Sequence, residues 1–445
     1  MKKIDSAVEK NRDLILSTQT YIWNHPETGY KEVLTSKYLE DTFENLGYKL
    51  VKAGDIPGFY TVFDTGRPGP EVMILCELDA IICENHPDAD PITGAVHGCG
   101  HSAQCAALVG IAAALCEKGV TDEFSGKIRL CAVPAEEFIE IEYRLSLIKE
   151  GRIHYMGGKT EFLYRGLFDG VDLAFMVHTT VGEKMLIRKG SVGMIAKQVS
   201  YEGVASHAGG SPWDGRNALY AATLGLSAIN SIRETFKEQD IIRVHPIITK
   251  GGDSVNTIPD DVRVESYIRG RTFEAMIEAN KKVNRALCGS ALSLGVNVNI
   301  HDMAGYAPLI NNNDMMEVAR DAASALPEIS VEFNDSIGSG STDMGDLSCV
   351  MPVVQPYIPG AEGHGHGSDA KIANPELACV GSAKWQMNML YLLLKDGAQR
   401  AKDIVKNYNA PFKSHEAYFN YIDKLKKEGI RINYNSDGTA SVDMF

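Results

Sequence analysis

The stretch Cys131-Ala-Val-Pro-Ala-Glu-Glu-Phe138 decides the fold, because an apolar segment leads directly into two adjacent carboxylates. Residues 127–133 are interpreted as a buried strand that delivers Glu136 and Glu137 at its carboxyl end. Two like charges this close repel each other unless a cation lies between them. Acids just past the end of a buried strand are typical of an α/β sheet, whose sites lie at the carboxyl ends of its strands.

Two further polar residues follow apolar segments in the same way. Asp79 comes after a predicted strand at 72–76, and His178 comes after a predicted strand at 173–177. A helix is predicted between these strands, from about 101 to 118. This alternation predicts an α/β domain with a mixed, mostly parallel sheet and a site at one edge of it.

The pattern changes near Lys189. From there the predicted elements are strand, helix, strand, strand, helix and strand, at 192–202, 214–233, 241–249, 261–269, 272–288 and 295–302. This order is that of a split-βαβ, ferredoxin-like module. We therefore predict an inserted domain over 189–303 and a discontinuous domain over 1–188 and 304–445 that carries the candidate site. The charged tail from 410 onward is expected to be a surface appendage.

The bulk composition excludes several classes of partner. The chain has 445 residues, which suits two or three domains, and its formal net charge of −14 is unsuited to nucleic acid or an anionic membrane. Its nine cysteines are scattered and odd in number, which indicates a reduced, cytoplasmic compartment. The longest apolar run, 12 residues from Cys105 to Cys116, is too short to span a bilayer. The amino-terminal residues predict a charged helix and no signal peptide.

Cys99 and His101 flank a single glycine, so both side chains can face one point in a loop. Thiolate and imidazole are ligands for zinc and the later first-row metals. The alternative is a buried cysteine beside a histidine that caps a helix. Glu136 and Glu137 cannot both point the same way, so one can bind a metal while the other accepts a proton from water. A solvated acidic turn is the alternative, and the apolar strand before the pair argues against it.

Other candidates have supporting roles and simpler alternatives. Asp79 can accept a hydrogen bond from a ligating histidine, or it can cap a helix. His364 and His366 can supply a distant metal ligand, or they can belong to a flexible surface loop. His207 is far in sequence from the other candidates, so it is a better donor to a developing oxyanion than a ligand. Asn256 can bind substrate through its amide, or it can belong to a hairpin turn.

Taken together, the motifs make the chain resemble the M20 metallopeptidase family. The likeness is closest to the amidohydrolase branch, which includes auxin-conjugate, hippurate and aminobenzoyl-glutamate hydrolases, and it spans roughly residues 10–400. The motifs that carry it are Leu78-Asp-Ala80, His97-Gly-Cys-Gly-His101, Pro134-Ala-Glu-Glu137, His178, Ser206-His-Ala208, Gly215-Arg-Asn-Ala218, Gly251-Gly, Asn256-Thr-Ile-Pro-Asp260 and Ser341-Thr-Asp-Met-Gly345.

The resemblance implies a catalytic α/β domain with an inserted lid, and a homodimer formed through that lid. It implies a divalent metal, as one or two ions of Mn²⁺, Zn²⁺, Co²⁺ or Ni²⁺. The implied ligands are Cys99, His101, Glu137, His178 and a histidine of the C-terminal loop, for which the spacing favours His366 over His364.

The resemblance also implies roles around the metal. Glu136 becomes the general base. In relatives, the histidine that matches His207 reaches the partner subunit's active site and helps to stabilise the oxyanion. The residues that match Gly252 and Asn256 contact the substrate.

The sequence departs from the branch at two positions next to the implied ligands. The branch usually continues its Cys-Gly-His with Asp, any residue and then His, whereas Ser102 and Gln104 stand at those places. The run Leu75-Cys-Glu-Leu-Asp-Ala-Ile-Ile82 also differs from the usual Arg-Ala-Asp-Met-Asp-Ala-Leu-Pro. These changes keep the implied ligands and leave open the substrate preference, the metal affinity and the number of ions.

The leading hypothesis is a metal-dependent hydrolase of amide bonds in N-acyl amino acids, amino-acid conjugates or small peptides, with metal-activated water and Glu136 as general base. One alternative, motivated by Ser102 and Gln104, is a metal-binding pseudoenzyme or ligand-binding protein that keeps the fold without turnover. Another is a metal-free α/β protein whose cysteine and histidines are structural.

Overall fold

The computed structural model describes residues 2–429 and 431–443, and their contacts divide the chain into two compact units. Unit 1 contains the chain up to Gly190, Leu309–Ile337 and Asp343–His415, and unit 2 contains Ser191–Pro308, Gly338–Thr342 and the chain from Glu416 onward. The predicted division assigns the whole C-terminal segment to the catalytic domain, whereas its contacts group the segment from Glu416 with unit 2.

Unit 1 is built around a six-stranded sheet in the order β1-β2-β6-β3-β7-β18. Its strands are β1 (Val51–Lys52), β2 (Phe59–Asp64), β3 (Glu71–Glu77), β6 (Lys127–Val133), β7 (Leu173–Phe175) and β18 (Val353–Val354). The strands from β6 to β18 are parallel, and β2 runs antiparallel to β6. Nearly every residue of β3 and β6 is buried, as expected at the centre of a mostly parallel sheet. The mixed, mostly parallel sheet predicted from the sequence is confirmed.

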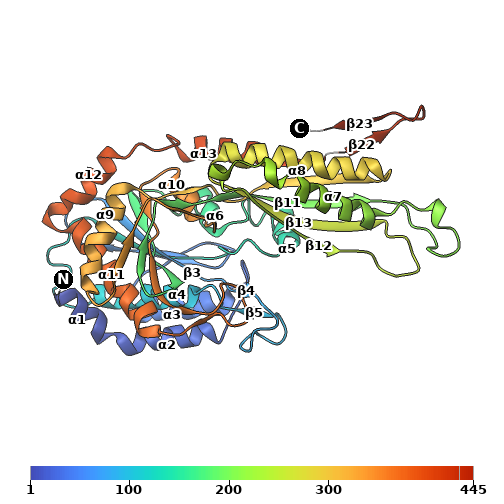
Figure 1. The fold of residues 1–445 in the computed structure, drawn as a ribbon. Coiled ribbons are helices and arrows are strands. Elements are labelled where there is room, and N and C mark those ends of the chain that lie inside the picture. The colour runs from blue at the N-terminus through green and yellow to red at the C-terminus, as the bar shows by residue number, and fades with distance from the viewer. Residues whose placement is uncertain (1, 430, 444–445) are drawn as a thin grey trace. The chain divides into compact units, whose positions relative to one another are not determined.

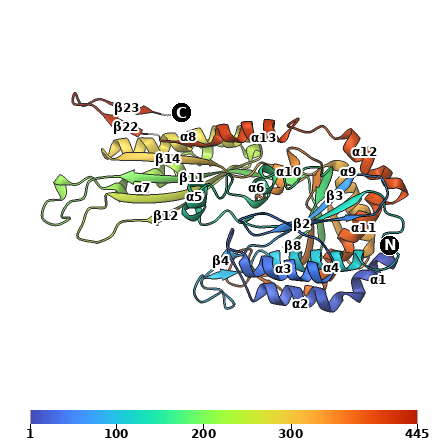
Figure 2. The ribbon, with the colours of Figure 1, turned by 180° about the vertical axis from the view of Figure 1, so that it is seen from behind.

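Helix α4 (His101–Leu115) is the central helix of unit 1, since all 15 of its residues are buried. Figures 1 and 2 show from opposite sides that it lies between the sheet and α2 (Arg12–Trp23). Its sequence is rich in alanine and has no polar side chain after Gln104, which explains why no side of it meets solvent. The burial of α4 fixes the position of His101 at its first turn.

The other helices that the structure describes in unit 1 are α1 (Lys2–Lys10), α3 (Val33–Asn45), α5 (Ile141–Lys149), α6 (Gly158–Tyr164), α9 (Asn313–Ala322), α10 (Met344–Ser348), α11 (Ser382–Leu394) and α12 (Gln399–Asn407). A second sheet contains β8 (His178–Val181), β9 (Met185–Ile187), β16 (Val331–Phe333), β19 (Tyr357–Glu362) and β20 (Lys371–Ile372). Short pairings are made by β4 (Ile81–Ile82) with β5 (Ala95–Val96), and by β10 (Gly190–Ser191) with β15 (Leu309–Ile310) and β17 (Ile337–Gly338).

Unit 2 has the predicted order of strand, helix, strand, strand, helix and strand. These elements are β11 (Gly193–Glu202), α7 (Ala218–Ile232), β12 (Arg243–Lys250), β13 (Asp261–Gly270), α8 (Phe273–Ser293) and β14 (Asn297–Ala304). The strands form an antiparallel sheet in the order β12-β13-β11-β14, which is the ferredoxin-like topology. Asn217 and Thr272 cap the two helices through their side chains. The predicted inserted module is therefore confirmed as a fold.

The C-terminal segment is more than the surface appendage expected from its sequence. It contains α13 (His415–Ile422), β21 (Lys427–Glu428), β22 (Arg431–Tyr434) and β23 (Ala440–Asp443). Strand β21 pairs with β14 and so covers one edge of the unit 2 sheet. Ile432 is buried in the core of unit 2, and the Tyr434 hydroxyl donates to carbonyls of Ala291 and Val296.

No helix among the described residues has both the length and the apolar character needed to cross a bilayer.

Candidate metal centre and active site

Neighbouring strands of unit 1 end at the same place and bring the candidate residues together. Asp79 lies just beyond β3, and His178 lies just beyond β7. The acid pair Glu136 and Glu137 lies beyond β6, which neighbours β3 on the side opposite to β7. Cys99 precedes α4, whose first turn faces the same edge. The sheet topology therefore assembles residues that are distant in sequence.

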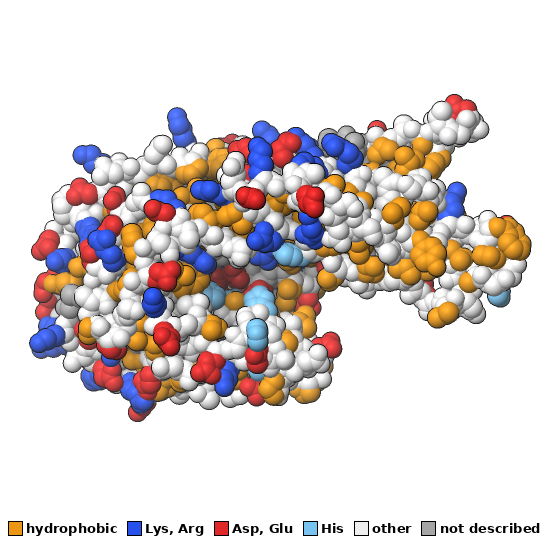
Figure 3. Space-filling view, in the orientation of Figure 1, with side chains coloured by type: hydrophobic (Ala, Val, Ile, Leu, Met, Phe, Trp, Pro, Cys, Tyr) orange, Lys and Arg blue, Asp and Glu red, His pale blue; other side chains and the backbone are white. Residues whose placement is uncertain are grey.

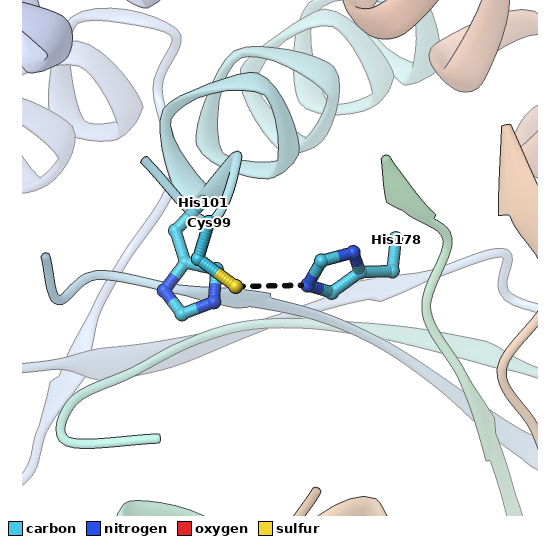
Figure 4. A group of neighbouring side chains, drawn as sticks. All are labelled: Cys99, His101 and His178. Atoms are coloured by element: carbon cyan, nitrogen blue, oxygen red, sulfur yellow. Dashed lines mark hydrogen bonds between the residues drawn. The ribbon is translucent and has the colours of Figure 1, made fainter. Parts of the chain in front are cut away.

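Three groups of described side chains have candidate ligand atoms within 4.8 Å of one another: Cys99, His101 and His178; Cys99, Glu137 and His366; and Glu77, His101 and Glu136. All five implied metal ligands belong to the first two groups. Cys99 is common to both, and Figure 4 shows its sulfur directed at the imidazole of His178 with His101 beside it.

The two histidines nearest to Cys99 are held by hydrogen bonds through Nδ1. His101 Nδ1 lies 2.8 Å from the Asp79 carbonyl and 3.2 Å from its Oδ1. His178 Nδ1 lies 2.7 Å from the Thr179 carbonyl, and its Nε2 lies 3.6 Å from Cys99 Sγ. Because acceptors occupy the Nδ1 side, each neutral ring keeps an Nε2 lone pair for another partner. Nε2 of His101 is buried and has no hydrogen-bond partner.

Asp79 links the two groups. Its Oδ2 accepts a hydrogen bond of 2.8 Å from the Glu137 backbone N–H, while its other atoms face His101. Glu137 Oε1 in turn lies 3.3 Å from His366 Nε2. His364 lies elsewhere, because it pairs with Asp369 at 2.9 Å and its side chain is 90% exposed. Of the two candidate histidines in the C-terminal loop, the structure therefore brings His366 to the site.

These donors fit a transition-metal ion. A thiol, several imidazoles and a carboxylate converge, which is a ligand set that zinc and its neighbours accept. The buried Nε2 of His101 makes no hydrogen bond, although Glu77 Oε2 lies 3.1 Å away, so it is an atom that a metal could bind.

The ionisation of the site also favours a cation. Burial and the nearby Glu137 raise the pKa of the Cys99 thiol, but the imidazoles of His101 and His178 outweigh both and bring that pKa to about 6. Burial raises the pKa of Glu137, yet the hydrogen bond with His366 reverses this and lowers it to about 2. Hydrogen bonds to Cys99 and to Glu137 raise the pKa of His366 to about 11. A divalent ion would meet charged ligand atoms here and would displace the proton of His366.

Glu136 differs from its neighbour in its environment. Burial, followed by the negative charges of Glu77 and Glu137, raises the pKa of Glu136 well above its usual range. Its Oε2 lies 3.9 Å from His101 Nε2, and the residue is only 8% exposed. A carboxylate with a raised pKa is a better proton acceptor near neutral pH. The site thus contains one strongly acidic and one weakly acidic member of the pair.

The backbone that carries the pair has an uncommon conformation. Ala135 has a φ of +58°, in the left-handed region. Its N–H donates to Glu32 Oε1 at 2.7 Å, and its carbonyl accepts from the buried Arg144 at 3.2 Å. Arg144 also donates to the carbonyls of Met156 and Glu137. These contacts hold the loop so that the two acids point in different directions.

Sequence reasoning did not find Glu32, Arg144 or Lys159, three buried charged residues around this loop. Charged residues are mostly exposed, so a single one in a helix or loop looks like surface. No motif marks these three in one sequence, and only their burial in the folded chain identifies them.

The candidates His207, Gly252 and Asn256 belong to unit 2. His207 Nδ1 accepts backbone hydrogen bonds from Gly209 at 3.1 Å and from Gly210 at 2.9 Å, which leaves Nε2 to carry the proton of the neutral ring. The next residue donates its N–H to the Asn256 carbonyl at 2.9 Å. Gly252 has a φ of +125°, which a residue with a side chain rarely adopts. The exposed His207 can therefore donate a hydrogen bond, beside the loop that carries Asn256.

A pocket of about 340 Å³ in unit 1 opens beside the clustered ligands. Its lining includes Cys99, His178, His366, Thr180, Glu362 and Lys371. Glu362 and Lys371 pair with each other at 3.5 Å. The pocket therefore offers both a negative and a positive side chain next to the candidate metal ligands.

Comparison with known proteins gives the family. The family described as "Peptidase family M20/M25/M40" matches residues 78–383. Xaa-Arg dipeptidase of Mus musculus is 29% identical over 380 residues, covering 80% of this chain and 78% of the relative. The indole-3-acetyl-aspartic acid hydrolase of Enterobacter agglomerans is 26% identical over 318 residues, covering 68% of each chain.

Solved structures share the fold. A structure described as a putative aminohydrolase from methicillin-resistant Staphylococcus aureus superposes with a TM-score of 0.68 at 22% identity, covering 88% of this chain and 100% of that one. A Bacillus subtilis protein described as a dinuclear metal-binding peptidase from the M20 family gives a TM-score of 0.63 at 18% identity, covering 87% and 99%.

Proposed function

We infer the roles of the site's residues from one premise: the chain belongs to peptidase family M20/M25/M40 and is a metal-dependent hydrolase of amide bonds. We propose that Cys99, His101, Glu137, His178 and His366 hold the metal. The observation that carries this assignment is the pair of side-chain groups that meet at the Cys99 sulfur.

Two ions would account for the arrangement better than one. In one group the ligand atoms of His101 and His178 lie near the Cys99 sulfur, and in the other group those of Glu137 and His366 lie near the same sulfur. A shared thiolate suits two divalent ions chosen from Mn²⁺, Zn²⁺, Co²⁺ and Ni²⁺. When bound, such ions would polarise the scissile carbonyl and lower the pKa of water.

Glu136 is the proposed general base. Its raised pKa and its position beside His101 let it accept a proton from the attacking water. The same carboxyl group would then return the proton to the leaving nitrogen. Arg144 and Glu32 keep the loop in the geometry that separates this role from that of Glu137.

His207 is the proposed donor to the oxyanion that forms at the attacked carbonyl. Its Nε2–H is free of the backbone contacts that occupy Nδ1, and the residue is exposed in unit 2. Gly252 and Asn256 are proposed to contact the substrate, since they lie on the loop that the His207 segment pairs with. The resemblance to the M20 family supports the assignment of His207 to the partner subunit's site.

The proposed substrates are dipeptides, N-acyl amino acids and amino-acid conjugates. The names of the relatives support this range, since they include an Xaa-Arg dipeptidase, an indole-3-acetyl-aspartic acid hydrolase and an N-acetyl-L-cysteine deacetylase. The pocket in unit 1 carries charged side chains of both signs, which suits substrates with a free carboxylate or a basic side chain.

A homodimer through unit 2 is proposed on the basis of its exposed apolar surface. Strand β12 is an open edge of the sheet and exposes 61% of Ile247. On helix α7, which packs against β13 and β11, Tyr220 is 65% and Leu224 is 41% exposed. Figure 3 shows hydrophobic side chains in orange at the end of unit 2 that carries α7 and its loops.

A cytoplasmic location is proposed as well, because all nine cysteines lie within the described residues and are free.

The test uses the full chain, loaded separately with Mn²⁺, Zn²⁺, Co²⁺ or Ni²⁺, against a panel of dipeptides, N-acyl amino acids and conjugates. Glu136→Gln should lower kcat by about 10²- to 10⁴-fold and keep the bound metal. Glu142→Gln, which changes an exposed acid on α5, is the matched control and should retain activity. Wild-type turnover in Glu136→Gln would remove this residue from the mechanism. Metal binding without turnover across the panel would favour the pseudoenzyme.

A further inference from the structure

A buried lysine lies next to the metal centre. The ammonium group of Lys159 is fully buried and donates to Glu77 Oε1 and Asp343 Oδ1, each at 2.5 Å. Asp343 Oδ2 also accepts the Lys159 backbone N–H at 2.8 Å. The position of Lys159 is fixed by close packing, because a Cβ added to the preceding Gly158 would lie 1.6 Å from the Pro134 carbonyl oxygen. The start of α6 is thus pressed against the loop that carries the acid pair.

The second carboxylate oxygen of Glu77 reaches the metal centre. Glu77 Oε2 accepts a hydrogen bond of 2.8 Å from Gln104 Nε2, and the Glu77 backbone N–H donates to Gln104 Oε1 at 3.1 Å. The same Oε2 lies 3.1 Å from Nε2 of His101, the atom that has no hydrogen-bond partner. Two ligands of one ion, each at about 2.0–2.2 Å from it, lie roughly 3 Å apart. Glu77 and His101 therefore have the spacing of two atoms that share an ion.

A second buried lysine in unit 2 shows what a purely structural pair looks like. Lys197 is buried and pairs with Asp302 and Asn284. The other oxygen of Asp302 accepts amide hydrogen bonds from Asn280 and Asn284. Every oxygen of that acid is thus directed at a neutral or positive donor of the protein. Glu77 differs, because its Oε2 also lies near Nε2 of His101, a proposed metal ligand whose Nε2 makes no hydrogen bond.

We propose that Glu77 is a further ligand of the ion held by His101, and that Lys159 and Gln104 are positioning residues that fix its two oxygens. The inference rests on the metal centre of the proposed function. It gives Gln104 and Asp343 a role: Gln104 orients Glu77, and Asp343 balances the charge of Lys159. An added carboxylate makes the site harder, so it favours Mn²⁺ over softer ions.

The test measures metal binding, separately from catalysis. Metal-free full-length wild type, Glu77→Gln, Gln104→Leu and Lys159→Met are titrated with Mn²⁺ and with Zn²⁺ against a fluorescent chelator, and bound metal is counted after dialysis. Glu77→Gln should lower the affinity for one of the two bound ions by about 10- to 100-fold and leave the affinity for the other ion unchanged. The decrease in affinity should be larger for Mn²⁺ than for Zn²⁺. Gln104→Leu should cause a smaller decrease in the affinity for the same ion.

Controls separate a binding role from a folding role. Lys197→Met removes the comparable lysine of unit 2, so it should lower the thermal midpoint and keep wild-type metal affinity. If Lys159→Met does not fold, Glu77→Gln and Gln104→Leu decide the question. Two ions bound by Glu77→Gln with wild-type affinity would overturn this inference and leave the proposed function intact. A wild type that binds neither ion would contradict the proposed function itself.

Discussion

At the scale of single residues, the site depends on side chains that hold other side chains. Asp79 is the clearest case, because it contacts His101 through one oxygen and the Glu137 backbone through the other. Its loss would free two candidate ligands at once. We therefore expect Asp79 to affect metal binding although it is not a proposed ligand.

Asp79→Ala should lower metal affinity by about 10- to 100-fold, because the Glu137 backbone N–H would lose its acceptor and the His101 ring would keep only the backbone carbonyl of residue 79. Isothermal titration of the metal-free protein with Zn²⁺ checks this. Asp369→Ala, which removes the exposed partner of His364, serves as the control and should bind as wild type does. Equal affinity in the two variants would contradict the role given to Asp79.

The residues of the site could be predicted from the sequence to the extent that they stand in short motifs. Cys99 and His101 share one motif, and Glu136 and Glu137 share another, so the sequence alone indicates the ligand types. Lys159 and Arg144 could not be predicted, because their partners come from segments far away in the chain. A buried ion pair leaves no periodic signal in a single sequence.

At the scale of elements, the strands were easier to predict than the helix ends. Strand β6 was predicted with its observed bounds, since an apolar segment followed by polar residues marks both ends. The charged helix predicted at the amino terminus is two helices, α1 and α2, which are divided at Asn11, where the side chain donates to the Ala7 carbonyl. Helix α11 is preceded by a π-helical segment, Glu376–Gly381, which the sequence pattern does not distinguish from an α-helix.

The turn before α5 gives a pH prediction. Burial raises the pKa of Glu140, but hydrogen bonds from Lys31 and Thr28 outweigh burial and lower that pKa below its ordinary value of 4.5. A carboxylate with a lowered folded-state pKa binds fewer protons in the folded protein than in the unfolded chain. Its stabilising contribution is therefore present above pH 4.5 and is lost as the pH falls through the folded-state pKa.

Urea unfolding of wild type and Glu140→Gln at several pH values checks this contribution. The wild type should be the more stable protein at pH 7, and the difference between the two free energies of unfolding should shrink as the solution is acidified. A difference that stays constant or grows toward low pH would show that Glu140 is not ionised and paired in the folded state.

At the scale of the whole molecule, one edge of the unit 2 sheet is covered and the other is open. The C-terminal strand β21 pairs with β14, whereas β12 has no neighbour on its outer side among the described residues. Open edges with apolar side chains are sites of association. The sequence could not predict this asymmetry, because the weakly patterned tail gives no sign that Ile432 is a core residue.

Leu224→Glu with Ile247→Glu should convert the proposed homodimer into a monomer, because each change places a charge at an exposed apolar position of unit 2, one on α7 and one on the open edge strand β12. Light scattering after size-exclusion chromatography measures the mass. Leu292→Glu, at a 42% exposed position on α8, is the matched control and should leave the mass unchanged. A wild type that is already monomeric at micromolar concentration would refute the dimer and the role of His207 in the partner subunit.

The central claim is that divalent ions are held around the Cys99 sulfur. Anomalous X-ray scattering from crystals grown with Zn²⁺ or Mn²⁺ tests it most directly. We expect two anomalous peaks that share Cys99 as a ligand, one beside His101 and His178 and the other beside Glu137 and His366. Anomalous peaks at other residues, or none near Cys99 in the metal-grown crystals, would contradict the account.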